Sequence, residues 1–206
     1  MNFGFWNVRG MNKEVKQRFV NNFLHTNNIG LFGLLETKVK SVNYHSIATN
    51  IFSDWSVSTN NAHHKGGRVW VIWKPHLFDI QFLHYDAQFI HLHVTNKITQ
   101  MQFYYTVIYA FNGIGEREAL WLNLKLISKQ CKAPWALGGD FNCVLQATER
   151  LGGNVTEAES EPFYDCFHEC GLMDIPSTGA FYTWNNKQPP DTRVYSRLDR
   201  LLVNHD

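Results

Sequence analysis

The sequence lacks an excess of charge of either sign. Its 206 residues include 19 Lys and Arg against 18 Asp and Glu, for a formal net charge of +1. A bulk electrostatic attraction to nucleic acid is therefore excluded, and any affinity for DNA must come from the local placement of charged side chains. Repeats and low-complexity tracts are also lacking. The length and the 44% hydrophobic content predict one domain over residues 1–206.

Cysteine is scarce and lacks the spacing of a metal site. The chain has four cysteines: Cys131, Cys143, Cys166 and Cys170. They form no CxxC pair, and the 10 histidines do not supply the other half of a zinc site. His91 and His93 share one face of a predicted strand, but without a third ligand nearby we expect surface or paired histidines. We therefore expect reduced, buried thiols in an intracellular protein of the nucleus or cytoplasm.

Long apolar runs are missing as well. Met1 leads directly into a predicted strand, with no basic segment followed by an apolar one, and no run is long enough to span a bilayer. These absences argue against secretion, membrane insertion and a membrane partner.

Apolar patterns predict an α/β chain. Alternating or continuous apolar runs predict strands over residues 2–9, 31–35, 55–59, 69–73, 78–84, 89–95, 101–109, 133–137, 181–184 and 194–203. Helical spacing predicts helices over residues 13–25 and 116–131, and one that ends at Gly171. The segment 38–50 is compatible with either a helix or a loop. Strands 78–109 follow one another with short turns, which predicts an antiparallel meander.

Two helix predictions are specific enough to test. In the first helix, Asn12 is predicted to cap the N-terminus. Its buried face is expected to comprise Val15, Phe19, Val20, Phe23 and Leu24. In the last helix, the expected buried residues are Phe163, Cys166, Phe167 and Cys170.

The segment Gly138-Gly139-Asp140-Phe141-Asn142 follows a short apolar strand. The glycines are expected to let the backbone turn sharply where the strand ends. In extended chain, Asp140 and Asn142 would share one side and Phe141 would point to the core. An ordinary polar turn is the alternative, since Gly, Asp and Asn are common turn residues.

Polar residues recur at the ends of apolar strands. They are Asn7, Glu36, Tyr109, Asp140, Asn142 and Asp199. Ligands and catalytic groups gather at strand ends in α/β domains. Carboxylate and amide oxygens are hard ligands that suit Mg²⁺ or Mn²⁺, so the sequence predicts a divalent metal site at these ends.

These residues lie in motifs that resemble a known family. The chain contains, in order, FWNVRG with Asn7, LLETK with Glu36, VIYA with Tyr109, GGDFN with Asp140 and Asn142, FYTWNN with Thr183, and YSRLDRLLVN with Asp199. The order is similar to that of the endonuclease/exonuclease/phosphatase superfamily. More narrowly, the chain resembles the endonuclease domain of plant LINE-type non-LTR retrotransposons.

The resemblance implies a fold and an activity. It implies a four-layer α/β sandwich, with two packed mixed β-sheets flanked by helices, and a Mg²⁺-dependent phosphodiesterase that nicks DNA to prime reverse transcription. It also implies that a reverse-transcriptase domain follows in the same polypeptide; the oligomeric state stays open. By the same resemblance Glu36 would hold the metal with help from Asn7, and Tyr109 would contact the scissile phosphate. Asp140 would orient or deprotonate the attacking water, and Asn142 would help to hold the phosphate.

The remaining site residues come from the C-terminal motifs. By resemblance, Thr183 and Trp184 would lie along the DNA groove, and Arg197 would also bind substrate. Asp199 would brace a histidine that faces the phosphate. From the residues alone, Asp199 could instead pair with Arg197 or Arg200, Tyr109 could be a core tyrosine, and Thr183 could be an ordinary strand residue.

One family motif is missing from the sequence. The superfamily pattern continues to a Ser-Asp-His motif and a last strand, whereas this sequence stops at His205-Asp206, too soon after Asp199 to replace them. We therefore expect a C-terminally truncated domain, without its last strand, of marginal stability and with activity reduced by several orders of magnitude.

Two alternative functions stay open at this stage. One is a nuclease of the abasic-site-repair type. The other is a non-catalytic retroelement remnant, with or without affinity for nucleic acid. The basic residues that could then bind nucleic acid are Lys38, Lys40, Lys65, Arg68, Lys187 and Arg193.

Overall fold

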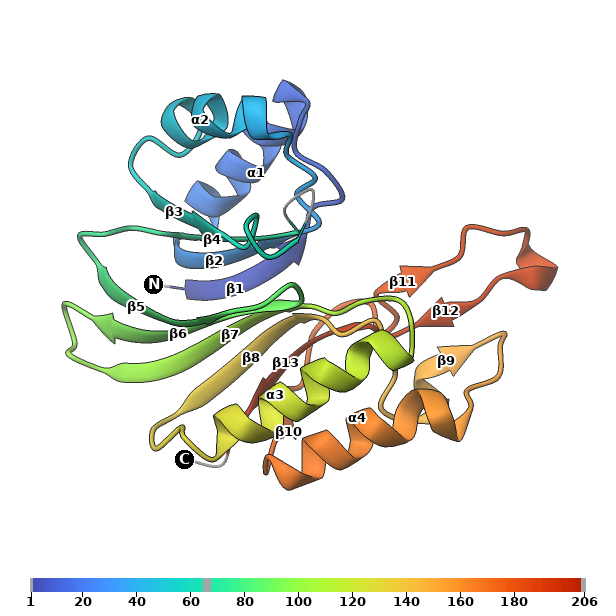
Figure 1. Ribbon diagram of the computed structural model, residues 1–206. Helices are drawn as coiled ribbons and strands as arrows, with labels where there is room; N and C mark the ends of the chain where they lie inside the picture. The colour runs from blue at the N-terminus through green and yellow to red at the C-terminus, as the bar shows by residue number, and fades with distance from the viewer. Residues whose placement is uncertain (1, 65–67, 205–206) are drawn as a thin grey trace. The chain divides into compact units, whose positions relative to one another are not determined.

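The computed structural model describes residues 2–64 and 68–204, which form two compact units (Figure 1). The first unit comprises Met1–Tyr109 and Leu137–Gly139, and the second comprises Ala110–Ala136 and Asp140–Asp206. One strand, β8 (Trp135–Asp140), contributes residues to both units. The single domain predicted over residues 1–206 stays a prediction.

The remaining elements each belong to one unit. The first unit contains β1 (Asn2–Asn7), α1 (Glu14–Thr26), β2 (Ile29–Leu35), α2 (Ser41–Asn50), β3 (Ser56–Thr59), β4 (Val69–Trp73), β5 (Phe78–Tyr85), β6 (Phe89–Asn96) and β7 (Gln102–Tyr109). The second unit contains η1 (Gly115–Arg117), α3 (Glu118–Ser128), η2 (Ala147–Glu149), β9 (Arg150–Leu151), α4 (Glu157–Glu169), β10 (Met173–Asp174), β11 (Trp184–Asn185), η3 (Pro190–Thr192), β12 (Tyr195–Ser196) and β13 (Asp199–Val203).

The strands form two large sheets and one small one. The first sheet has the order β1-β2-β4-β3, with β1 parallel to β2 and the other pairs antiparallel. The second has the order β10-β13-β8-β7-β6-β5, and β9, β11 and β12 form the small sheet. The consecutive antiparallel strands β5, β6 and β7 confirm the predicted meander. The predicted α/β class, with two large mixed sheets flanked by helices, is also confirmed.

Within the first unit, β1 and β2 pack against β7. The Tyr105 hydroxyl donates a hydrogen bond to the Gly4 carbonyl at 2.9 Å, and the Phe3 and Tyr105 rings meet edge to face with centroids 5.3 Å apart. A side chain at Gly33 would overlap Val107, so only glycine allows this close approach. These contacts place the two sheets face to face in this unit.

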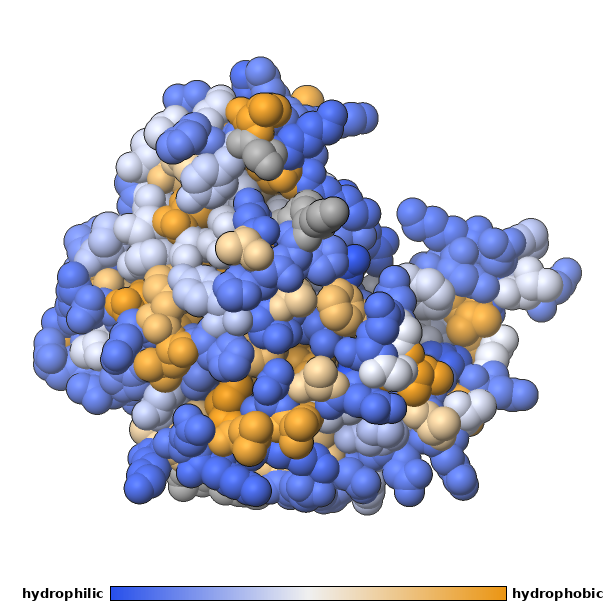
Figure 2. Space-filling view, viewed as in Figure 1, coloured by the Kyte–Doolittle hydropathy of each residue, from blue (hydrophilic) through white to orange (hydrophobic). Residues whose placement is uncertain are grey.

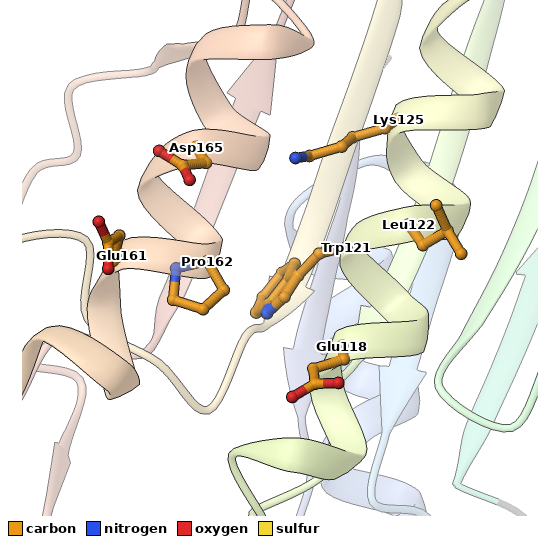
Figure 3. Close-up of a pocket in the computed structure, with 7 residues that line it drawn as sticks. All are labelled: Glu118, Trp121, Leu122, Lys125, Glu161, Pro162 and Asp165. Atoms are coloured by element: carbon orange, nitrogen blue, oxygen red, sulfur yellow. The ribbon is translucent and has the colours of Figure 1, made fainter.

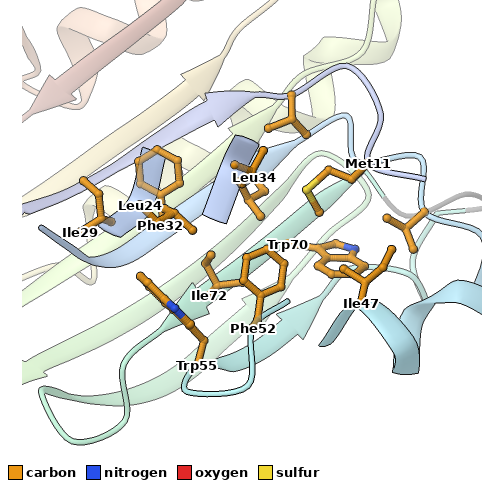
Figure 4. Close-up of a cluster of buried hydrophobic side chains, with 13 residues drawn as sticks. Met11, Leu24, Ile29, Phe32, Leu34, Ile47, Phe52, Trp55, Trp70 and Ile72 are labelled. Carbon is orange, nitrogen blue, oxygen red and sulfur yellow. The ribbon is translucent and has the colours of Figure 1, made fainter. Parts of the chain in front are cut away.

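The outer face of the first sheet is covered by α1 and α2 (Figures 1 and 4). The apolar cluster beneath the helices comprises Val8, Met11, Val20, Leu24, Ile29, Phe32, Leu34, Val39, Ile47, Phe52, Trp55, Trp70 and Ile72. Of the two structures considered for the segment 38–50, the helix is found: α2 begins at Ser41 and buries Ile47.

The predicted buried face of α1 is correct in part, and its predicted cap is wrong. Val20 and Leu24 are buried as expected and Phe23 packs against the core, but Val15 is 82% exposed and Phe19 57% exposed, and Gln17 is buried instead. The helix is rotated because the Gln17 side chain donates a hydrogen bond to the Met11 carbonyl at 2.8 Å and so turns inward.

Asn12 does not cap α1, because its side chain is used elsewhere. Its amide donates to the Lys38 carbonyl, and its oxygen accepts from the Lys40 backbone N–H at 3.1 Å. The N-cap residue is Lys13, which makes no side-chain capping bond. Asn12 therefore joins the connection after β1 to the connection after β2.

The two glycines before Asp140 do not form the predicted turn. Gly138 and Gly139 lie inside β8. A side chain at Gly138 would come within 2.6 Å of the Phe5 ring, and one at Gly139 would overlap the Ile108 carbonyl oxygen. Both glycines are required for close packing, not for a change of chain direction.

In the second unit, α3 and α4 pack together around aromatic rings. The ring of Phe163 stacks on Trp121 at 4.8 Å and on Phe141 at 5.0 Å. The inward orientation predicted for Phe141 is confirmed, and Phe163 and Cys166 are buried as expected. All four cysteines are free thiols, also as expected.

The last predicted strands are shorter in the structure. The candidate 181–184 is reduced to β11, and the strand predicted over 194–203 is divided into β12 and β13. The division arises because the backbone N–H of Arg197 bonds to the Glu149 carbonyl, and that of Leu198 to the Thr183 hydroxyl. The chain thereby leaves the small sheet and enters the large one.

The surface of the described residues is mixed in character. Hydrophilic residues dominate the face seen in Figure 2, with hydrophobic residues between them. The exposed hydrophobic residues of the chain include Leu122 and Leu126 of α3. No helix among the described residues is long and apolar enough to cross a membrane.

His91 of β6 is a paired core histidine. Its Nδ1 lies 2.8 Å from the Thr106 hydroxyl, and its ring stacks on Tyr104. Burial, followed by the charges of His84 and His93, lowers the pKa of His91 from 6.5 to about 4. The unfolded chain therefore binds one more proton than the folded chain between these two values.

We expect acid to destabilise the fold through His91. The free energy of unfolding should fall by about 3 kcal/mol as the pH drops from 6.5 to 4, and this loss should stop below pH 4. Urea unfolding followed by circular dichroism at several pH values measures it. The variant His91→Gln should lose less stability over this window, while His25→Gln, at an exposed position of α1, should match the wild type. Identical pH dependence in all three proteins would contradict this assignment.

Candidate active site

Asn7 and Glu36 lie at the ends of neighbouring parallel strands. Asn7 is the register partner of Leu35, the residue before Glu36. Beyond the strands, the Val8 N–H bonds to the Leu35 carbonyl at 3.0 Å and the Gly10 N–H to the Glu36 carbonyl at 2.8 Å. The backbones of Asn7 and Glu36 therefore lie at neighbouring strand ends, and their joint role as metal ligands stays a prediction.

The backbone around this pair is held in an unusual conformation. Arg9, Glu36 and Lys38 all have positive φ angles, of 51°, 53° and 49°. Such angles are uncommon for residues other than glycine and cost free energy. Asn7 helps to hold its turn, because its side-chain oxygen accepts a hydrogen bond from the Arg9 N–H at 3.2 Å. The strain lies in the two loops that follow β1 and β2.

The Glu36 carboxylate faces a cation. Its Oε1 lies 2.6 Å from the Lys38 ammonium, and its side chain is 19% exposed. The Glu36 carboxylate and the Asn7 amide are the kinds of hard oxygen donor that Mg²⁺ and Mn²⁺ prefer, and such sites need few protein ligands because waters complete the coordination. Within residues 2–64 and 68–204, no group of three or more His, Cys, Asp or Glu is arranged to hold a metal ion. The chemistry of the donors fits a divalent cation held by two protein residues.

Tyr109 lies at the same end of the first unit. Along β1 and β2, Phe3 contacts Tyr105, and Gly33, the partner of Phe5, contacts Val107. These strands therefore run in the same direction as β7, so the C-terminal end of β7 lies near the ends of β1 and β2. The last residue of β7 is Tyr109.

The Tyr109 ring is largely buried and covered by a cation. It is 7% exposed, and the Arg68 guanidinium lies over it, 5.3 Å from the ring centroid. The Tyr109 N–H donates to the Gln88 carbonyl at 2.8 Å. A buried tyrosine at a strand end, next to an arginine, combines features of a core residue with those of an anion-binding site.

In the second unit, Asp140 and Asn142 meet through a turn. Asn142 has a φ of 46°, and its N–H donates to the Asp140 carboxylate at 3.0 Å. The expectation that the two share a side because the chain is extended is therefore wrong: the chain turns at Asn142 and brings its backbone to the carboxylate. The Asn142 amide also donates to the Ala110 carbonyl at 2.6 Å, and the Ala110 N–H bonds to the Asp140 carbonyl. Asp140 is 6% exposed, and these hydrogen bonds hold both its carboxylate and its carbonyl.

Thr183 holds the start of β13. Its hydroxyl oxygen accepts the backbone N–H groups of Leu198 and Asp199, both at 3.1 Å. The Leu198 carbonyl accepts the Phe141 N–H at 2.9 Å. Asp199 is therefore anchored beside the end of β8, next to the Asp140 turn. Trp184 lies in β11 of the small sheet and is the register partner of Ser196.

Arg197 belongs to a buried ion-pair cluster. Its guanidinium contacts Asp174 at 2.9 Å and Glu149 at 3.4 Å, and both carboxylates also bind Arg200, whose side chain is fully buried. Burial alone would raise the pKa of Glu149, but the hydrogen bond and charge of Arg200 lower it overall. Both arginines thus pair with Glu149 and Asp174. The ligand role predicted for Arg197 from the sequence stays a prediction.

A pocket of about 310 Å³ lies between α3 and α4 (Figure 3). It is lined by Glu118, Trp121, Leu122, Lys125, Glu161, Pro162 and Asp165. The Lys125 ammonium is paired with Glu169 at 2.6 Å. None of the predicted site residues lines this pocket.

Some residues of the candidate site were missed by the sequence analysis. Asn60 is fully buried, and its side chain bonds to the Arg68 and Val69 N–H groups and to two carbonyls of the turn before β6. An asparagine in a polar turn carries no sequence signal for such a role. Four residues named in the sequence analysis lie outside the described residues: Met1, Lys65, His205 and Asp206.

Comparisons with known proteins give a family and a fold. A sequence model of the Endonuclease/Exonuclease/phosphatase family matches residues 4–206. None of the curated proteins compared with the chain matches it. Solved structures do: the endonuclease domain of TRAS1, a telomere-specific non-LTR retrotransposon, is 15% identical with a TM-score of 0.73, covering 99% of this chain and 85% of that chain.

Two further structures are similar over nearly the whole chain. The 3′ phosphatase NExo from Neisseria, bound to a product DNA hairpin, is 18% identical with a TM-score of 0.71, covering 98% of this chain and 86% of that chain. The AP endonuclease LMAP from Leishmania major is 13% identical with a TM-score of 0.74, covering 98% and 78%. At these identities the likeness shows the fold.

Proposed function

The chain belongs to the endonuclease/exonuclease/phosphatase family, and from this premise we propose that it is a Mg²⁺-dependent endonuclease that nicks DNA. We propose further that it serves a LINE-type non-LTR retrotransposon of a plant, in a polypeptide that also carries a reverse transcriptase. The resemblance of its motifs to such domains supports this, as does the shared fold with the TRAS1 endonuclease domain.

The observation that carries the proposal is the register of β1 and β2. It sets Asn7 beside Glu36 at two parallel strand ends, with Tyr109 at the same end of the unit. Polar groups at such ends, in strained loops, are typical of active sites.

Glu36 and Asn7 are the residues that would hold the metal ion. Mn²⁺ would fit the same oxygen donors. When bound, the ion would neutralise charge on the phosphate and on the leaving oxygen. On the side of the protein, the Glu36 carboxylate supplies the negative charge and Asn7 a neutral oxygen, so the site keeps coordination positions for water and phosphate.

Tyr109, Asp140 and Asn142 would act on the substrate. The Tyr109 hydroxyl donates to a phosphate oxygen, and the Asp140 carboxylate orients the attacking water and takes its proton. Asn142 uses one amide N–H for the Ala110 carbonyl, which leaves its second N–H for the phosphate. The Asn142 N–H bonds to the Asp140 carboxylate and the Ala110 N–H to the Asp140 carbonyl, so Asp140 is held in one position. A fixed position supports its role in orienting the attacking water.

Four residues of the C-terminal part would support binding. Thr183 and Trp184 would lie along the DNA groove, and Asp199 would brace a histidine. Arg197 would contribute to substrate binding from the ion-pair cluster, where Asp174 fixes its guanidinium. The anchoring of Asp199 by the Thr183 hydroxyl supports a joint placement of these two residues.

We expect the protein to convert supercoiled plasmid to the open circular form in Mg²⁺ and not in EDTA. Replacing Glu36 by Gln removes the charge that holds the metal, so the nicking rate should fall by about 100-fold or more and recover partly at higher Mg²⁺. The matched control is Glu14→Gln, since the Glu14 carboxylate is 80% exposed. Both this chain and a longer form with a Ser-Asp-His segment are assayed, so that the result does not depend on where the chain ends.

The outcomes separate the alternatives. Equal rates for Glu36→Gln and Glu14→Gln would contradict the metal role. Cleavage restricted to abasic DNA would favour the repair-type nuclease. DNA binding without nicking in either form would favour the non-catalytic retroelement protein.

A further inference from the structure

Arg68 lies immediately before β4 and over the ring of Tyr109. The distance from its guanidinium carbon to the ring centroid is 5.3 Å, within the range of a cation–π contact. The contact adds a permanent positive charge at the end of the first unit that carries Asn7, Glu36 and Tyr109. Nothing in the motifs that identify the family involves this residue.

The position of Arg68 is fixed by a buried amide. The Asn60 side-chain oxygen accepts the N–H groups of Arg68 at 3.3 Å and Val69 at 3.0 Å, and its amide donates to the carbonyls of Asp86 and Ala87 at 3.0 and 3.1 Å. Asn60 is fully buried, so each of these bonds is shielded from water. The turn before β4 is thus bound to the turn before β6.

The same network holds Tyr109. The Gln88 carbonyl accepts the Tyr109 N–H at 2.8 Å, and the Gln88 N–H donates to the Asp86 carboxylate at 2.9 Å. Gln88 is itself buried. One set of hydrogen bonds therefore holds the backbone at Arg68 and at Tyr109, the two residues whose side chains meet in the cation–π contact.

We infer that Arg68 binds a phosphate of the DNA backbone and positions it beside Tyr109. The inference rests on the proposed function and names a further residue that recognises its substrate. An arginine stacked on an aromatic ring loses little additional freedom when it binds, and its planar N–H groups match the geometry of a phosphate. Arg68 is a positioning residue: the phosphate that it binds is not the one that reacts, because the reacting phosphate is assigned to Tyr109 and Asn142.

The test measures DNA affinity against salt concentration in EDTA, so that no cleavage occurs. Each phosphate neutralised by a cation contributes about 0.9 to the slope of log Kobs against log salt. The variant Arg68→Gln should lose about 0.9 of this slope and bind more weakly at low salt. Arg68→Lys keeps the charge, so it should keep the slope, while KM for nicking rises because the planar stacking is lost.

The matched control comes from the other end of β4. Lys74 follows that strand, and its ammonium also lies over an aromatic ring, Trp55, at 5.3 Å. The variant Lys74→Ala should bind DNA with the wild-type slope. Thermal unfolding of each variant shows whether it is folded, and a purely structural Arg68 would change the melting temperature without changing the slope.

Three results would overturn the inference: the first two leave the proposed function standing, and the third does not. If Arg68→Gln binds DNA with the wild-type slope, Arg68 contacts no phosphate, while the proposed function stands. The same holds if Arg68→Lys loses as much slope as Arg68→Gln, because charge would then not be the cause. If the wild-type protein binds no DNA, the proposed function fails and the role of Arg68 fails with it.

Discussion

Replacing Asp140 by Asn is expected to lower the rate of DNA nicking by about 10³- to 10⁴-fold. The variant keeps the size of the side chain and an oxygen that can accept the Asn142 N–H, which the carboxylate accepts at 3.0 Å. It cannot take a proton from water. The loss therefore isolates the chemical role of the carboxylate from its structural one. The rate is measured under single-turnover conditions in Mg²⁺, on the longer form as well as on this chain.

The control for this prediction is Asp79→Asn, at an exposed position of β5. Its rate should equal that of the wild type. The affinity of Asp140→Asn for DNA in EDTA should not fall, since the substitution removes a negative charge. A rate within threefold of the wild type would show that Asp140 does not act on the water, and that its buried carboxylate serves only the turn at Asn142.

Replacing Gly139 by Ala is expected to prevent stable folding. The new methyl group would overlap the backbone carbonyl oxygen of Ile108 in β7, and backbone atoms cannot move aside as a side chain can. We expect a loss of more than about 4 kcal/mol, which is comparable with the total stability of many domains. The measurement is urea unfolding by circular dichroism, or the soluble yield where the protein does not fold.

Gly115→Ala provides the comparison, because a side chain at Gly115 in η1 would meet nothing within 4 Å. Its stability should stay within about 1 kcal/mol of the wild type. A Gly139→Ala protein that unfolds at the wild-type urea concentration would contradict the packing role of this glycine.

Local patterns predicted most of the elements correctly. The continuous run at β2, the strong strand β4 and the meander β5–β7 all follow from apolar residues that are close in sequence. The α1 face was wrong at Val15 and Phe19 because Gln17, a polar residue, turns inward to bond with Met11, and no periodicity records that. The break between β12 and β13 depends on Glu149 and Thr183, which are distant in sequence.

For the candidate site, the sequence indicated candidate residues but not their arrangement. Strand-end positions identified Asn7, Glu36 and Asp140. Their neighbours come from long-range pairing: the register of β1 with β2 sets Asn7 beside Glu36. Arg68 could not be assigned a position from the sequence, since its place over Tyr109 depends on the buried Asn60. The two glycines of GGDFN were recognised as important, but for the wrong physical reason.

The discontinuity of the first unit has a consequence for synthesis on the ribosome. Residues up to Tyr109 emerge first, yet the unit also needs Leu137–Gly139, which follow the segment Ala110–Ala136. At roughly 5–20 residues per second, the nascent chain waits a few seconds before the residues that pair with β7 have been made. During that interval the edge of β7 is open to other chains. Slow translation or a pause within residues 110–136 should therefore increase aggregation, and chaperones that bind apolar surface should associate with the nascent chain at this stage.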